Sequence, residues 1–127
     1  MKSHKWISVL FWIGGIYDGL LGLLFLLFGM SIFEMYNITP PNHIGYIQFP
    51  GALLIIFGLM FIAIARNPVA WRHFIIYGIL LKVAYCGTVF SHWIISGLPW
   101  IWKPFAICDL IFGVLFVIAY LQLKRPE

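Results

Sequence analysis

The chain has 127 residues, of which 63% are hydrophobic and 9% are charged, and its formal net charge is +4 at pH 7. A soluble domain is about half apolar and a quarter charged, so this chain has too few polar residues to cover a fold that faces water. Its basic residues lie at the ends of apolar runs and form no stripe, which argues against a nucleic-acid partner. The composition predicts one small domain, 1–127, whose solvent is the lipid bilayer.

Four apolar segments are long enough to cross the hydrocarbon core of a bilayer, which takes about 20 helical residues. The first segment begins just after Lys5, exceeds the core of a signal peptide and is expected to be retained as a helix. Turn-forming residues separate the segments, at 39–42, 66–68 and 97–99. The four segments cover about residues 6–29, 46–65, 74–95 and 104–123.

Each segment is predicted to be an α-helix, because a segment in lipid must satisfy its own backbone hydrogen bonds. Short connections then favour an all-α, antiparallel four-helix bundle. Glycines recur at helical spacing in the first two segments, at Gly15, Gly19, Gly22, Gly51 and Gly58. Small residues let helices approach closely in lipid, so we expect these glycines to pack the bundle's own helices. A face for a homodimer is the less favoured alternative.

The Lys and Arg residues that flank the segments indicate the orientation of the protein. Only Lys103 falls on the side of the first and third connections, and Lys82 lies within a segment. Because cytoplasmic loops carry an excess of Lys and Arg, both termini are predicted to be cytoplasmic, in the inner membrane of the cell. Six basic residues fall on this predicted cytoplasmic side: Lys2, Lys5, Arg66, Arg72, Lys124 and Arg125.

Three charged residues, Asp18, Lys82 and Asp109, lie inside the apolar segments. Each costs about 2.5–3.5 kcal/mol at the centre of a helix in the membrane, so each is expected to face the bundle interior with a partner. With a rise of about 1.5 Å per residue, the three lie at depths that allow them to meet in one layer. Two carboxylates around one ammonium leave an excess negative charge. Either one carboxyl then carries a proton, or a further cation completes the set.

Two more residues belong to this candidate centre. Tyr85 shares a helical stripe with Lys82, and His92, near the outer end of the third segment, is a candidate for the further cation. Two interpretations stay open. The cluster is either a buried salt bridge that fixes which helices pair, or a binding centre for a ligand or a proton. In the second case, neutral isosteres of Asp18, Lys82 and Asp109 should abolish function while the protein still inserts.

Metal, cofactor and catalytic sites are not predicted. His43 and His92 lie towards the outer face with Glu34 and two methionines, but no pair has the spacing of a known metal site. Cys86 and Cys108 form no CxxC pair and are expected to behave as small apolar residues.

Short motifs occur along almost the whole chain: Tyr17-Asp18 with Leu20-Leu21-Gly22, Pro40-Pro41-Asn42, Gln48, Gly51, Gly58, Arg66-x-Pro68, Gly78 with Lys82, Leu98-Pro99-Trp100 and Asp109-Leu110-Ile111. They resemble those of a group of small four-helix bacterial membrane proteins without an established function, which are broadly DoxX-like. The resemblance implies the fold. It implies no activity, because neither the redox complexes nor the membrane-protein assembly linked to DoxX-like proteins maps onto a motif here. In this group, Asn often stands at the position of Asp18.

Three functions are compatible with this sequence. The favoured one is a non-enzymatic membrane protein that binds a partner membrane protein or a small lipophilic ligand. The first alternative is a proton-coupled carrier that works through the layer of Asp18, Lys82 and Asp109 and needs a dimer to form its pathway. The second alternative is a membrane subunit of an oxidoreductase.

Overall fold

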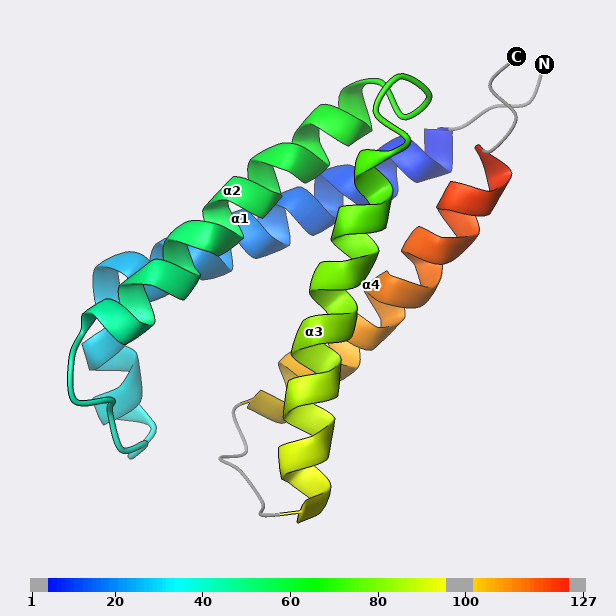
Figure 1. The fold of residues 1–127 in the computed structure, drawn as a ribbon. Helices are drawn as coiled ribbons and strands as arrows, with labels where there is room; N and C mark the ends of the chain where they lie inside the picture. The colour runs from blue at the N-terminus through cyan, green and yellow to red at the C-terminus, as the bar shows by residue number, and fades with distance from the viewer. Residues whose placement is uncertain (1–4, 96–101, 124–127) are drawn as a thin grey trace.

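The computed structural model describes residues 5–95 and 102–123, and this part of the chain folds into four α-helices (Figure 1). Each helix is long and apolar enough to cross a membrane, which confirms the predicted all-α four-helix membrane bundle. The predicted turn at 97–99 and the basic residues Lys2, Lys124 and Arg125 lie outside the described residues. The helices are α1 (Lys5–Met35), α2 (Gly45–Arg66), α3 (Phe74–Ile95) and α4 (Trp102–Gln122).

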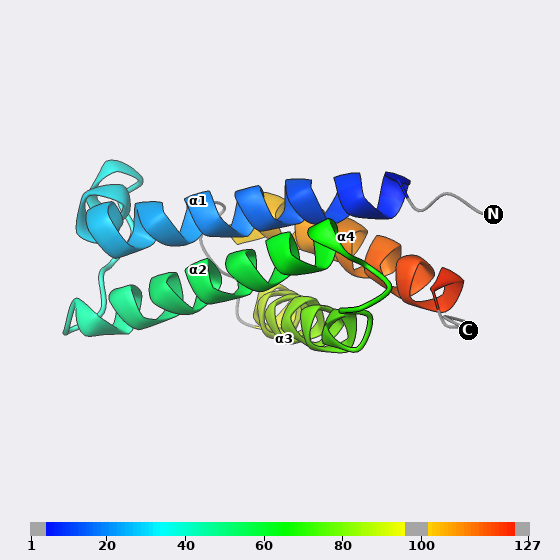
Figure 2. The same ribbon diagram turned by 90° about the horizontal axis from the view of Figure 1, so that it is seen from above.

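The four helices form two antiparallel hairpins, α1–α2 and α3–α4, and contacts within each hairpin far outnumber those between them (Figure 1). In Figure 2, α1 and α2 lie across the view, α4 slants across it and α3 is seen nearly along its axis, so the second hairpin is inclined to the first. The hairpins meet at the end where α1 begins and α4 ends, and they diverge towards the other end. We call these the closed end and the open end.

Glycines bring α1 and α2 into backbone contact, as expected of bundle packing. A Cβ atom added at Gly58 would lie 2.8 Å from the carbonyl oxygen of Gly15 and 2.9 Å from the backbone nitrogen of Gly19. Gly22 and Gly51 face each other in the same way further along the hairpin. Because backbone atoms cannot swing aside, any larger residue at these positions would separate the helices.

An aromatic core holds the hairpins together at the closed end. The ring of Phe11 stacks on that of Phe116 with centroids 4.4 Å apart, and the ring of Phe61 meets Phe116 edge-on at 5.1 Å. Gly78 of α3 leaves room for this cluster, because a Cβ there would lie 2.6 Å from the Phe61 ring. All three phenylalanines are fully buried. The core therefore joins residues of all four helices.

Polar contacts reinforce the closed end. The Trp6 indole donates a hydrogen bond of 3.2 Å to the side-chain oxygen of Gln122, which joins the start of α1 to the end of α4. Arg72 donates from Nε to the carbonyl oxygen of Tyr120 at 3.3 Å, and its guanidinium lies 3.8 Å from the centroid of the Tyr120 ring. These contacts place the described basic residues Lys5, Arg66 and Arg72 together at this end of the molecule.

The first helix is longer than the predicted segment, because it continues past Gly29 to Met35 after a kink at Phe28. It ends in a Schellman motif: Ile38 N–H donates to the carbonyl of Phe33 at 2.8 Å, and Asn37, in the left-handed conformation (φ 57°), donates to Glu34 at 3.2 Å. The kinked segment carries Phe33 back over the open end of the molecule.

Candidate functional site

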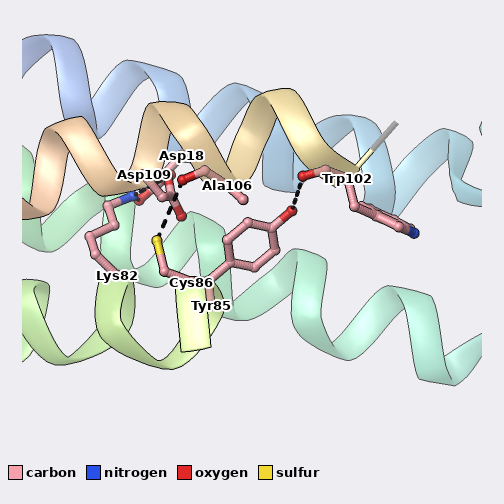
Figure 3. A network of polar contacts seen from close by, with 7 residues as sticks. All are labelled: Asp18, Lys82, Tyr85, Cys86, Trp102, Ala106 and Asp109. Carbon is pink, nitrogen blue, oxygen red and sulfur yellow. Dashed lines mark hydrogen bonds and ion pairs between the residues drawn. The ribbon is translucent and has the colours of Figure 1, made fainter. Parts of the chain in front are cut away.

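The structure brings Asp18, Lys82 and Asp109 into one hydrogen-bonded cluster (Figure 3). Lys82 Nζ donates to both carboxylate oxygens of Asp18, at 3.1 Å and 2.9 Å, and to Oδ1 of Asp109 at 3.1 Å. Asp18 and Lys82 are each 1% exposed, and Asp109 is 8% exposed. An ammonium has three N–H donors, so these bonds use them all. The ion pairs tie α1, α3 and α4 together.

Small and aromatic residues shape the surroundings of the ammonium. A Cβ added at Gly113 would lie 3.4 Å from Cβ of Lys82, so the glycine lets the lysine stem pass between α3 and α4. Lys82 Nζ lies 5.4 Å from the ring centroid of Phe112, 5.6 Å from that of Phe61 and 5.8 Å from that of Tyr17. Ring faces are favourable neighbours for a desolvated cation. The charged cluster therefore adjoins the aromatic core of the closed end.

A cavity of about 480 Å³ lies between the two hairpins on the open side of the charged cluster. Asp18 and Asp109 form one end of it, and Phe33, Tyr46 and Trp102 lie at the other. Its volume falls within the range of about 300–1,000 Å³ that is usual for small-molecule sites. The lining is mostly apolar and comes from all four helices: Tyr17, Asp18, Leu21, Phe25, Phe33, Tyr46, Ile47, Pro50, Gly51, Leu53, Leu54, Phe57, Leu81, Tyr85, Trp102, Phe105 and Asp109.

The cavity is closed along α1 and α4 and open along α2. Trp102 stacks on Phe25 with ring centroids 5.9 Å apart and meets Phe33 edge-on at 6.0 Å, which covers the α1–α4 side. On the α2 side, the lining residues Tyr46 and Leu53 are 69% and 37% exposed. In a bilayer this surface faces lipid, so an apolar molecule can reach the cavity sideways from the membrane.

Tyr17 and Asp109 line the cavity, and each carries a polar atom that has no hydrogen-bond partner within the described structure. The hydroxyl oxygen of Tyr17 is fully buried and does not open onto the cavity. A buried polar group without a partner is costly. The Oδ2 atom of Asp109 is not fully buried, and it accepts no hydrogen bond from a described residue, since Lys82 binds Oδ1. The Asp109 carboxylate therefore keeps an acceptor oxygen that is available to a ligand or to water.

Tyr85 and Cys86 lie on α3 beside Lys82, and their polar atoms bind the backbone of α4 (Figure 3). The Tyr85 hydroxyl donates to the carbonyl oxygen of Trp102 at 3.3 Å, and the Cys86 thiol donates to that of Ala106 at 3.4 Å. Tyr85 also lines the cavity, whereas Lys82 does not. Its ring forms part of the wall while its hydroxyl holds α3 to α4.

His92 is not brought to the cluster. It is exposed, it does not line the cavity, and ten residues of helix place it about 15 Å along α3 from Lys82. Within the described residues, no group of three or more His, Cys, Asp and Glu side chains is placed to hold a metal ion. A role for Asp18, Lys82, Tyr85, His92 or Asp109 in binding a ligand or a proton stays a prediction.

Sequence reasoning did not single out two residues of this site. Tyr17 precedes Asp18 and enters the sequence analysis only as part of a motif, yet it lines the cavity and its hydroxyl is buried. Trp102 has no place in the sequence analysis, yet it packs on two rings of α1. The signal that could have found Trp102 is its position seven residues before Asp109, which places both on one face of α4.

Comparison of the chain with protein-family models, with curated proteins and with solved structures finds no match. The function of the site is therefore inferred from its own geometry.

Proposed function

We propose that this integral membrane protein binds a small lipophilic molecule in the cavity between its two hairpins. The observation that carries the proposal is the position of the cavity: its one polar end is formed by carboxylates of a cluster whose charges are almost fully buried. A salt bridge that only joined helices would need no adjoining space. Here Asp18 and Asp109 border a volume that is large enough for a ligand and open to the bilayer.

The division of the molecule into layers supports this proposal. The aromatic core at the closed end holds the hairpins together. The charged cluster lies next to this core, and the cavity lies on the other side of the cluster, towards the open end. Ligand sites in helix bundles are commonly built in this way, from side chains on facing helices. A partner membrane protein is less well supported, because no feature of the lipid-facing surface identifies one.

Blocking the cavity should prevent a neutral apolar probe from binding. Leu21 lines the cavity, whereas its neighbour Leu20 is 57% exposed and faces away from it. In lipid nanodiscs, photoactivated benzophenone is expected to form adducts with cavity residues, and mass spectrometry locates them. Leu21→Trp should raise the concentration for half-maximal labelling at least about tenfold, or about 1.4 kcal/mol. Leu20→Trp introduces the same side chain outside the cavity and should leave labelling unchanged. Adducts confined to lipid-facing residues in all three proteins would overturn the proposal.

The proposal includes the orientation of the protein in the inner membrane, with the closed end in the cytoplasm. Its support is the gathering of Lys5, Arg66 and Arg72 at that end, with Lys103 at the other. The cavity then opens within the outer half of the bilayer.

Accessibility of single cysteines tests this orientation. In a background with both native cysteines replaced by alanine, a membrane-impermeant maleimide should label Asn42→Cys in intact cells. It should label Val69→Cys, in the connection between α2 and α3, only after the membrane is permeabilised. The opposite pattern would reverse the orientation.

The relation to DoxX-like membrane proteins is also part of the proposal. Its support is that the motif residues Asp18, Leu21, Gly51 and Asp109 all line the cavity, and that Lys82 binds two of them. A solved DoxX-like structure with only apolar residues at the corresponding positions of its bundle would speak against it.

A further inference from the structure

The charges at the polar end of the cavity do not balance. When all three groups are ionised, two carboxylates and one ammonium give the cluster a net charge of −1. Within the described residues, Asp18 and Asp109 form ion pairs with Lys82 alone. The other described acidic residue, Glu34, is exposed near the end of α1 and does not line the cavity. Among the described residues, no positive side chain lines the cavity to offset the carboxylates.

Lys82 is absent from the residues that line the cavity. Together with Asp109 it lines a shallow groove on the other side of α3 and α4, so Asp109 borders both the groove and the cavity. Its donors are used by Asp18 and by Oδ1 of Asp109, which leaves Oδ2 of Asp109 without a partner in the described structure. A molecule in the cavity therefore meets carboxylate oxygens. Because the surroundings are apolar, their negative potential is weakly screened.

Aromatic rings surround this carboxylate end. The ring of Tyr17 lies beside Asp18, and the rings of Phe57, Tyr85 and Phe105 continue the wall. Ring faces attract cations, most strongly where water is excluded, and aromatic walls of this kind suit quaternary ammonium groups. Carboxylate oxygens, ring faces and an excess negative charge all favour a positive group and disfavour an anion.

We propose that the cavity selects a lipophilic cation: an apolar body of limited size that carries an amine or a quaternary ammonium group. The positive group lies against Asp109 and Asp18, and the apolar body fills the aromatic part towards Trp102. This inference rests on the proposed function and adds the chemical class of the ligand. When a ligand with one positive charge is bound, the net charge of the cluster plus the ligand is zero.

Three probes with the same photochemistry separate charge from shape. They are benzophenone, which is neutral, (4-benzoylbenzyl)trimethylammonium, a cation, and 4-benzoylbenzoate, an anion. These probes partition differently into lipid, so their labelling cannot be compared directly. For each probe, the informative quantity is the half-labelling concentration of Asp109→Asn divided by that of the intact protein. Asp109→Asn keeps the neutral pair of Asp18 and Lys82. We expect it to raise the half-labelling concentration of the cation at least about tenfold, as for other buried charge partners, and to leave that of benzophenone unchanged.

Glu34→Gln provides the matched control, since it removes a carboxylate outside the cavity and should change neither probe. The anion should label lipid-facing residues only. If Asp109→Asn leaves cation labelling unchanged while benzophenone still labels the cavity, the cation inference fails and the proposed function stands. That outcome would mean that a proton already balances the cluster. If no probe labels the cavity of the intact protein, the proposed function itself fails.

Discussion

Lys82→Met is expected to destabilise the protein by about 3–5 kcal/mol, the typical cost of removing one partner from a buried ion pair. Methionine keeps the length of the stem, so the packing against Gly113 changes little. Asp18 and Asp109, which now share one ammonium, would be left buried without a positive charge. The penalty arises whether they stay ionised and repel each other or take up protons. The midpoint of thermal unfolding in detergent, followed by circular dichroism, measures it.

Two further variants show whether the loss comes from unpaired charge. Lys103→Met removes a lysine at the open end whose Nζ lies 4.8 Å from the Trp93 ring centroid, and it should cost about 0.5–1 kcal/mol. The triple variant Asp18→Asn, Lys82→Met, Asp109→Asn leaves no charge in the cluster and should regain most of the stability. A Lys82→Met protein that unfolds at the midpoint of the intact protein would show that the cluster does not hold the helices together.

Alanine at Gly22 or Gly58 is expected to have the second largest effect. At Gly58 the added methyl group would lie 2.8 Å from the carbonyl oxygen of Gly15, and at Gly22 it would meet the carbonyl of Gly51. Relief requires α1 and α2 to move apart, which costs about 1–3 kcal/mol for an overpacked contact. Unfolding midpoints in the same detergent measure the loss.

Gly87→Ala is the matched control for these glycines. A Cβ at Gly87 meets no atom within 4 Å, and alanine is a better helix former than glycine by about 1 kcal/mol. This substitution should therefore leave stability unchanged or raise it slightly. Equal losses at Gly22, Gly58 and Gly87 would mean that backbone contact between α1 and α2 is not what pairs them.

The fold could be predicted because lipid leaves few alternatives. A long apolar segment must form a helix to satisfy its backbone, and the bounds of α2 and α3 nearly coincide with the predicted segments. The meeting of Asp18, Lys82 and Asp109 follows from the same physics, because a charge in lipid has to face inward and depth along each helix is set by its rise. Contact between the glycines of α1 and α2 follows from their spacing.

The shape of the site could not be predicted from these rules. Hydropathy does not fix the angle at which the α3–α4 hairpin crosses the α1–α2 hairpin, and that angle creates the cavity. No proline predicts the kink at Phe28, although this kink brings Phe33 to Trp102. Net charge suggested His92 as a further cation, but its position along α3 is too far from Lys82 for a side chain to bridge.

The most direct test of a ligand site at the cluster uses the two aspartates of the chain, Asp18 and Asp109. Labelling aspartate carboxyl groups with ¹³C gives one NMR signal from each in lipid nanodiscs, and the signal that is lost in Asp109→Asn identifies that of Asp109. Saturation with (4-benzoylbenzyl)trimethylammonium is expected to shift both signals, that of Asp109 more, and to shift neither in Leu21→Trp. Two signals that stay in place while the probe saturates the intact protein would show that the cluster is a structural ion pair and that no ligand reaches it.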